Sequence, residues 1–355
     1  MLYQSRNPHG GDIYDGQIDL DFSANTNPFG TPEGIITAVS QALPQMHRYP
    51  DPFCRKLIAA IADHEQTEPG QILCGNGAAE LIYAYCHAIR PRTALVPAPT
   101  LSEYQLGLET VGCQVRHYGL KQENGFSITE EMADCIESIR PDAVFLCNPN
   151  NPTGNLIAPS VLDRILDVTR KHRIHLFLDE CFLDLCDGGE SLKSRLSEHP
   201  QLFLLKAFTK SYGMAGIRLG YCLCGDPETL SAMAKATQPW NVSSLAQAAG
   251  IAALEEQEFL EKTKRLVHGQ RLWLQKELQD LGFWVSDSRT NYLLFKGPVG
   301  LHTAMRERRI AIRSCANYEG LGEGWYRIAV RQPEENQKLM SAMRECLEKE
   351  KLWQK

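Results

Sequence analysis

The chain has 355 residues, of which 43% are hydrophobic and 23% are charged, and its formal net charge at pH 7 is -6. A length of this order predicts about two domains, and the composition is that of an ordinary globular protein. The negative charge balance gives no reason to expect nucleic acid or an anionic membrane as a partner.

The N-terminal residues contain no apolar core of signal-peptide length, and no apolar run approaches the roughly 18 to 20 residues of a membrane span. We therefore expect a cytoplasmic protein with no membrane partner. The 12 cysteines lie singly in apolar segments, without a Cys-x-x-Cys pair; Cys222 and Cys224 come nearest to one. This spacing is not typical of a zinc site, so we expect reduced core cysteines and no metal.

Residues 1–30 form a segment rich in Gly, Asn and Pro, with His9 and Gly10 near its start and Asn25 near its end. This composition predicts loops that expose many backbone and amide donors. An arm of this kind either moves freely or wraps a site. From Thr31 onward the pattern becomes helical.

A short apolar run at residues 71–74 is followed by Gly-Asn-Gly-Ala-Ala at 75–79 and then by a helical pattern. Free backbone N–H groups at a helix start form a cradle for phosphate, and glycines allow the close approach that such a cradle needs. The same residues also fit a plain strand-to-helix turn, so two interpretations stay open for this motif.

Apolar strands then alternate with amphipathic helices. This pattern predicts an α/β fold in which a mostly parallel sheet is covered by helices on both faces. The expected strands are 93–97, 114–118, 142–147, 174–178, 201–205 and 217–223, and the expected helices are 102–110, 129–139 and 159–171.

Beyond about residue 245 the composition shifts to a long charged helical region, 246–281, followed by short strands and a closing helix over 334–348. This part predicts a smaller α+β domain that packs with the N-terminal arm. We expect a large domain over 31–244 and a small domain made of 1–30 and 245–355.

Several residues that could take part in catalysis or ligand binding lie at or just past the ends of predicted strands: Gly75, Asn148, Asp179 and Lys210. Ligands of mostly parallel sheets bind beyond the carboxyl ends of the strands, so we expect these residues to share one site. Asp179 ends a buried strand, where a carboxylate needs a cationic or donor partner.

Lys210 follows an apolar strand and precedes Arg218 by eight residues. Lysine forms a Schiff base with a carbonyl once its surroundings lower the ammonium pKa, and Arg218 could hold an anion nearby. Two alternatives stay open at this point. Lys210 and Arg218 could both be solvated charges that flank a strand. Alternatively, Lys206 could be the reactive amine instead of Lys210.

Taken in order, five features resemble the fold-type I family of pyridoxal-phosphate-dependent aminotransferases over essentially the whole chain. They are the Gly-x-Gly turn, the loop Asn-Pro-Asn-Asn-Pro-Thr-Gly at 148–154, Asp179, Thr-Lys at 209–210 and Arg218. The resemblance implies a large domain that binds pyridoxal 5'-phosphate and a homodimer. It also implies that Asp179 keeps the ring nitrogen protonated and that Lys210 acts as acid or base over Cα.

The resemblance also implies a role for each cofactor-binding residue. By this resemblance, Lys210 is the Schiff-base lysine, Asp179 contacts the ring nitrogen and Asn151 contacts the ring hydroxyl. The phosphate of the cofactor is bound by Gly77, Ala78, Thr209 and Arg218. Tyr49 reaches into the site of the neighbouring subunit.

The chain departs from the family at several positions. Leu101 stands where an aromatic side chain usually stacks on the ring, and Tyr104 nearby is a possible substitute. Phe182 stands where a tyrosine usually contacts the ring oxygen, and Ala207 where a hydroxyl residue usually precedes the lysine. The lost phenol counts against plain transamination.

Within the family, the arm, residues 22–30, Phe182 and residues 312–318 resemble the threonine-phosphate decarboxylases of cobalamin biosynthesis most, and the histidinol-phosphate aminotransferases next. Arginine forks suit a substrate that carries both a phosphate and a carboxylate. The resemblance implies a small phosphorylated amino acid bound by His9, Gly10, Asn25, Asn151, Arg313 and Arg331.

Alternatives remain for these assignments. His9 also fits an ordinary surface histidine, Arg331 an exposed strand face and Arg313 a charge at a dimer surface. For the whole chain, the alternatives to a decarboxylase are a transaminase of histidinol phosphate and a binding or regulatory protein that keeps the fold without the chemistry.

Overall fold

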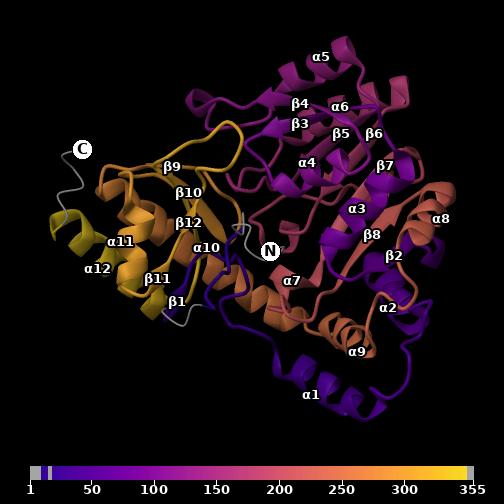
Figure 1. The fold of residues 1–355 in the computed structure, drawn as a ribbon, viewed down its shortest axis with the longest axis horizontal. Helices are drawn as coiled ribbons and strands as arrows, with labels where there is room; N and C mark the ends of the chain where they lie inside the picture. The colour runs from indigo at the N-terminus through magenta and orange to yellow at the C-terminus, as the bar shows by residue number, and fades with distance from the viewer. Residues whose placement is uncertain (1–8, 15–17, 350–355) are drawn as a thin grey trace.

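The computed structural model describes residues 9–14 and 18–349. A seven-stranded sheet with the order β2-β8-β7-β6-β5-β3-β4 forms the larger part of the molecule, at the right of Figure 1. Its strands are β2 (Ile72–Gly75), β3 (Thr93–Ala98), β4 (Gln114–Gly119), β5 (Ala143–Cys147), β6 (His175–Asp179), β7 (Leu202–Ala207) and β8 (Gly220–Cys224).

The sheet is mostly parallel, as expected from the sequence. Only β8 runs antiparallel to its two neighbours, β7 and β2. The sequence pattern predicts that this strand begins at residue 217, but it begins at Gly220. The reason is that Arg218 has a positive φ of 61°, which belongs to a bend and not to an extended strand.

The centre of the sheet consists of strands that are buried on both faces. Phe145, Phe177 and Phe203 are register partners on β5, β6 and β7. Their rings stack across the strands, with centroids 4.6 and 5.1 Å apart. Strands of this kind need helices on both faces, and Figure 1 shows the sheet among helices.

The helices of this part are amphipathic; α6, for example, buries Val161, Leu162, Ile165 and Leu166 on one side. The bounds are α1 (Glu33–Ala42), α2 (Arg55–Glu65), α3 (Ala78–Ile89), α4 (Ser102–Glu109), α5 (Glu130–Ile139), α6 (Pro159–His172), α7 (Phe208–Ser211), α8 (Pro227–Ala236), α9 (Ser244–Ala253) and α10 (Gln257–Asp280). Short 3-10 helices cover Leu43–Gln45, Pro69–Gln71, Gln122–Asn124, Leu183–Leu185 and Leu192–Arg195.

Two details of the helices differ from the sequence prediction. The helical region expected over 246–281 consists of two helices, α9 and α10, which are separated at residues 254–256. Helix α8 was not expected, although Asp226 accepts hydrogen bonds from the backbone N–H groups of Glu228 and Thr229, as an N-cap residue does.

A four-stranded antiparallel sheet with the order β12-β13-β10-β9 forms the smaller part, at the left of Figure 1. The remaining elements are β1 (Leu20–Asp21), β9 (Trp284–Val285), β10 (Tyr292–Lys296), α11 (Leu301–Glu307), β11 (Ile310–Ala311), β12 (Arg313–Ser314), β13 (Trp325–Ala329) and α12 (Pro333–Lys349). The arm joins this part, because β1 pairs in parallel with β11 and Phe22 lies in its apolar core.

The domain division at residues 30/31 and 244/245 remains a proposal. The second boundary coincides with the start of α9, and this helix packs against α1. Within the described residues, no helix is both long enough and apolar enough to cross a membrane.

Candidate active site

A cavity of about 280 Å³ opens at the carboxyl edge of the large sheet, where residues of both sheets and of the arm meet. Ten of the residues predicted for the site line it: His9, Gly10, Asn25, Ala78, Asn151, Asp179, Thr209, Lys210, Arg218 and Arg313. Leu101 and Phe182, the two departures from the family, line it as well.

The sheet topology explains why these residues meet. The parallel strands β5, β6 and β7 all end at this edge, which brings Asp179 and Lys210 there. Strand β8 runs the opposite way and starts at the same edge, where Gly220 is the register partner of both Gly75 and Ala207. Arg218, two residues before β8, therefore reaches the site from an antiparallel strand.

Lys210 lies in the short helix α7 and faces the cavity. Burial lowers the pKa of its amine to about 8, and the positive charges of Arg327 and Arg218 contribute to that fall. A larger share of the amine is therefore uncharged near neutral pH than for an ordinary lysine. This is the state in which lysine is a nucleophile.

Lys206 has the opposite environment. It is buried, and its ammonium lies 3.2 Å from Glu65 Oε1, 3.8 Å from Glu180 Oε2 and 4.0 Å from Asp184 Oδ1. Although burial opposes its charge, these carboxylates raise the pKa of Lys206 above its ordinary value. Lys206 is thus ion-paired and does not line the cavity, whereas Lys210 faces it.

Asp179 ends β6 and is 4% exposed. Burial raises the pKa of its carboxyl group, and hydrogen bonds offset only part of that rise. The Tyr104 hydroxyl donates to Oδ2 at 2.6 Å and the Cys181 N–H donates to Oδ1 at 2.8 Å. These two donors fix the carboxylate at the cavity wall, where it can accept a hydrogen bond from a ligand.

The turn at Gly77 has the features of an anion cradle. Gly77 is the N-cap of α3 and has a φ of 80°, and a Cβ built on it would come within 2.6 Å of Arg218 Nη2. A Cβ on Gly220 would likewise lie 2.6 Å from the Ala78 backbone nitrogen. The positive φ at Gly77 and the close backbone approach at Gly220 therefore favour glycine at both positions, where the helix start with its free N–H groups lies beside a guanidinium.

Asn151 is held by Arg327 of β13 and by Tyr318 of the loop between β12 and β13. Its Oδ1 accepts a hydrogen bond of 2.5 Å from Arg327 Nη1 and one of 3.4 Å from the Tyr318 hydroxyl. Because the side-chain oxygen is used in this way, the Asn151 amide NH₂ is the group left to donate to a ligand.

Arg327 was missed in the sequence analysis. It is the register partner of Arg313 across β12 and β13, so both side chains point to the same face, and the two residues are 6% and 9% exposed. Among the described residues, Arg327 has no carboxylate partner, and its Nε is buried without a hydrogen bond. Two adjacent buried cations at a cavity are suited to an anionic ligand.

The arm covers another part of the cavity. His9 Nε2 lies 2.6 Å from Glu103 Oε1, and the Gly11 N–H donates to Ser23 Oγ at 2.8 Å. A Cβ on Gly10 would come within 2.2 Å of the Ser23 carbonyl oxygen, so this close contact requires glycine. Asn25 is 2% exposed, and its Oδ1 has no hydrogen-bond partner among the described residues. That oxygen is available to a ligand.

Five residues expected at the site do not line this cavity: Gly75 and Gly77 lie in the turn before Ala78, which does line it, Asn148 lines a separate cavity, and Arg331 and Tyr49 lie elsewhere. Arg331 lies two residues beyond β13, and its Nη2 donates to Glu335 Oε1 at 3.0 Å. Tyr49 is 79% exposed and stacks on Trp240, with ring centroids 4.6 Å apart. Neither is among the residues that line the cavity.

Tyr104, Tyr318 and Glu103 are further residues of the site that the sequence analysis did not assign. The sequence indicates Tyr104 only as a substitute for the ring-stacking aromatic. It instead donates a hydrogen bond to Asp179, and that contact joins residues 75 positions apart in the chain.

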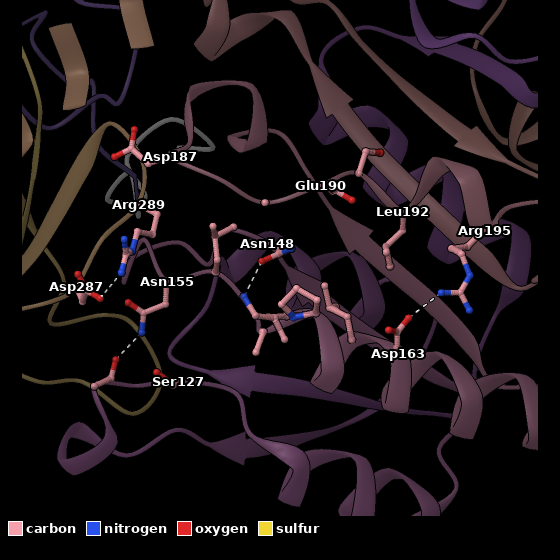
Figure 2. A pocket seen from close by; sticks show the side chains of 18 of the residues that line it. Ser127, Asn148, Asn155, Asp163, Asp187, Glu190, Leu192, Arg195, Asp287 and Arg289 are labelled. Carbon is pink, nitrogen blue, oxygen red and sulfur yellow. Dashed lines mark hydrogen bonds and ion pairs between the residues drawn. The ribbon is translucent and has the colours of Figure 1, made fainter. Parts of the chain in front are cut away.

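A second and larger cavity, of about 880 Å³, lies elsewhere (Figure 2). It is lined by the loops around Asn155 and Glu190, the start of α6 and Arg289 of the small part. Its charged side chains are mostly paired, as in the contacts of Asp163 with Arg195 and of Asp287 with Arg289. It shares no lining residue with the cavity of Lys210.

The residues of the first cavity fit pyridoxal phosphate. The cradle of Gly77, Ala78 and Arg218 suits its phosphate, and the Lys210 amine, with a pKa of about 8, suits its aldehyde. The buried carboxylate of Asp179 suits its ring nitrogen. No part of this set requires a metal ion.

Comparisons with known proteins agree with this fit. Residues 17–343 match the family model of aminotransferase class I and II. The chain is 34% identical to the threonine-phosphate decarboxylase of Salmonella typhimurium, over 96% of each chain. It is 30% identical to the histidinol-phosphate aminotransferase of Caldanaerobacter subterraneus, over 91% of this chain and 92% of that protein.

Solved structures show the same fold. The histidinol-phosphate aminotransferase from Clostridium acetobutylicum superposes with a TM-score of 0.85 at 27% identity, covering 92% of this chain and 98% of that one. The structure of the enzyme from Sinorhizobium meliloti in complex with pyridoxal-5'-phosphate gives a TM-score of 0.86 at 22% identity, over 98% and 96% of the two chains. The chain therefore belongs to the class I and II aminotransferases, the fold-type I family of enzymes whose cofactor is pyridoxal 5'-phosphate.

Proposed function

We propose that the protein is a lyase that decarboxylates L-threonine O-3-phosphate to (R)-1-aminopropan-2-ol O-phosphate and CO₂, as a step of cobalamin biosynthesis. The observation that carries this proposal is the cross-strand pair of Arg313 and Arg327 in the wall of the Lys210 cavity. Two adjacent guanidinium groups can together hold the phosphate of such a substrate and leave its carboxylate free. The 34% identity to a threonine-phosphate decarboxylase over nearly the full length supports the same substrate.

The residues of the chain have separate tasks in this reaction. When bound, the cofactor acts as an electron sink for a bond broken at Cα of the substrate. Asp179 would hold the ring nitrogen of the cofactor, and the Asn151 NH₂ would donate to the ring hydroxyl. Lys210 carries the proton that Cα receives after the C–C bond breaks and the carboxylate carbon leaves as CO₂.

Substrate orientation decides which bond breaks. With the cofactor bound, the Cα bond aligned with its π system would be the one that is weakened. If the arginine pair, with His9 and Asn25, binds the phosphate end of the substrate, no guanidinium holds the carboxylate, and it would be free to leave as CO₂. If a guanidinium holds the carboxylate instead, the Cα–H bond would break. With Arg331 outside the cavity, Arg327 is the proposed partner of Arg313.

A histidinol-phosphate aminotransferase is the second candidate, because proteins of that name match at 30% identity and share the fold. One observation opposes it. Phe182 lies in the cavity with its ring 5.7 Å from Lys210 Nζ and has no hydroxyl to contact the cofactor ring oxygen, as the usual tyrosine does.

The deciding experiment supplies the purified protein with pyridoxal phosphate and one of three substrates: phosphothreonine, phosphoserine or histidinol phosphate. We expect CO₂ from phosphothreonine without any keto acid, and no pyridoxamine phosphate. Pyridoxamine phosphate formed from histidinol phosphate, without CO₂ from phosphothreonine, would establish the aminotransferase instead. An unchanged biological function in a Lys210→Ala variant would support the non-enzymatic alternative.

We also propose a cytoplasmic homodimer in which Tyr49 completes the neighbouring site. Tyr49, Met46 and Phe53 are 79%, 66% and 64% exposed, and such a group of apolar side chains is suited to a partner surface. Mixing inactive Tyr49→Ala and Lys210→Ala subunits tests this arrangement. If the site is shared, hybrid dimers regain one intact site and part of the activity. Sedimentation as a monomer, or no regain in verified hybrids, contradicts the arrangement.

A further inference from the structure

A cluster of buried charges lies behind the active site, on the side of β7 that faces away from the cavity. Leu205 and Ala207 line the cavity, so the intervening Lys206 points to the opposite face of the sheet. There its ammonium contacts Glu65, Glu180 and Asp184. Glu65 and Glu180 are 3% and 1% exposed, so both carboxyl groups have lost most of their contact with water.

The cluster is joined directly to both reactive residues. Glu180 follows Asp179 in the chain, and its backbone N–H donates to the Leu205 carbonyl at 2.9 Å. Ser211 follows Lys210, and its hydroxyl donates to Asp184 Oδ2 at 3.1 Å. The segment that carries Asp179 and the segment that carries Lys210 therefore meet at the same cation, Lys206.

The far side of the cluster is fixed as well. Glu180 accepts hydrogen bonds from Ser191 Oγ at 2.6 Å and from the Leu192 N–H at 2.9 Å. These two residues belong to the wall of the larger cavity, where Figure 2 shows Leu192. Glu65 accepts from the Tyr221 hydroxyl at 2.5 Å, and Lys193 Nζ lies 2.9 Å from Glu65 Oε2.

Charge pairing keeps this arrangement together. The cations Lys206 and Lys193 and the Tyr221 hydroxyl lower the pKa of Glu65 to about 2, although burial opposes that shift. Removing the central cation would leave buried carboxylates without their partner, which is strongly unfavourable and forces the chain around them to move. The segments that would move are those next to Asp179 and Lys210.

We propose that Lys206 is a positioning residue for the active site, which acts through Glu180 and Asp184 to fix Asp179 and Lys210 relative to each other. This inference rests on the proposed use of Asp179 and Lys210 to hold the cofactor. Lys206 itself does not touch the cavity and moves no proton in the reaction.

The test compares three variants of the cofactor-loaded protein. Lys206→Met removes the cation at similar length, Lys206→Arg keeps it, and Lys193→Met removes the other cation that contacts Glu65 but touches neither Glu180 nor Asp184. The measurements are the affinity for pyridoxal phosphate by equilibrium dialysis, the visible circular dichroism of the bound cofactor, kcat and KM.

For Lys206→Met we expect about tenfold weaker cofactor affinity, a changed visible dichroism and a kcat lower by about tenfold or more, with KM within about threefold. Lys206→Arg should recover most of each value, and Lys193→Met should resemble the wild type. A Lys206→Met protein with a lower melting temperature but wild-type affinity, dichroism and kcat would show a purely structural role and overturn the proposal.

If Lys206→Met does not fold, Ser211→Ala decides the matter, because it removes the bond to Asp184 without leaving a charge unpaired. A changed dichroism and a threefold or larger loss of kcat support positioning; wild-type values overturn it. If the wild type releases no CO₂ but binds the cofactor, the proposed function fails while affinity and dichroism still test this inference. A wild type that binds no pyridoxal phosphate overturns both.

Discussion

Lys206 and Lys210 lie four residues apart at the end of β7, and their surroundings shift their pKa values in opposite directions. Lys206 contacts three carboxylates, which raise its pKa. Lys210 is near Arg327 and Arg218, which add to the effect of burial and lower its pKa to about 8. Burial disfavours the ammonium in both cases, so the sign of the shift is decided by the neighbouring charges.

The comparison shows how one strand end serves two purposes. On one face, carboxylates surround Lys206 and tie the strand ends together; on the other, arginines lie near Lys210, an arrangement suited to an anionic ligand and to an uncharged amine. A variant at either lysine should therefore produce a different defect, and the following predictions use that difference.

The largest effect is expected for Lys210→Ala. Loss of the amine should lower decarboxylation by about a thousandfold or more, because no other side chain can replace it as nucleophile and proton carrier. Borohydride treatment of the cofactor-loaded wild type should leave the cofactor on the peptide that contains residue 210, as seen by mass spectrometry. Retention of the cofactor on Lys206 in either protein would reverse the assignment of the two lysines.

Asp179→Asn comes next. An amide cannot stabilise a positive ring nitrogen as a carboxylate does, so we expect kcat to fall by about a hundredfold, which corresponds to a few kcal/mol. Tyr104→Phe removes only the hydrogen bond to Oδ2 and should cost about tenfold or less. Steady-state kinetics with both variants show which substitution lowers kcat more. Equal losses would mean that the carboxylate is not the essential group.

Replacing one arginine of the cross-strand pair tests the anion site. Arg327→Lys loses the two-pronged contact and should lower kcat/KM by about tenfold to a hundredfold. Arg331→Lys is the matched control and should stay within about twofold, because Arg331 is tied to Glu335 and lies outside the cavity wall. A larger effect at Arg331 than at Arg327 would restore the original sequence assignment.

The smallest effect is the pH dependence of the amines themselves. Since the pKa of Lys210 is lowered to about 8, its uncharged fraction should rise about fivefold between pH 7 and pH 8. Trace acetylation of the cofactor-free protein, read by mass spectrometry, should show a midpoint near pH 8 for Lys210 and little labelling of Lys206. A midpoint near pH 10 for Lys210 would contradict the comparison.

The same pKa shift has a consequence for stability. Between about pH 8 and the ordinary pKa of lysine near 10.4, the unfolded chain holds a proton on residue 210 that the folded chain has lost. The contribution of Lys210 to the stability of the cofactor-free protein therefore becomes more favourable as pH rises through this window.

The sequence by itself determined the family and the cofactor, and it predicts the site residues that belong to continuous motifs. Asp179, Lys210 and the Gly77 turn are set by strand ends, and a strand end is visible in the local pattern of apolar residues. These features follow from the alternation of secondary structure and from backbone needs such as the positive φ of Gly77.

Only the tertiary structure decided which of two arginines near the end of β13 reaches the site. Arg327 and Arg331 are four residues apart, and every residue of the strand Trp325–Ala329 is buried, so the sequence pattern gives no sign of which arginine faces the cavity. The pairing of Arg327 with Arg313 and the end of the strand before Arg331 depend on neighbouring segments. The same is true of Tyr104 beside Asp179 and of the carboxylates around Lys206, since contacts between distant segments are set by packing and register, which no local pattern records.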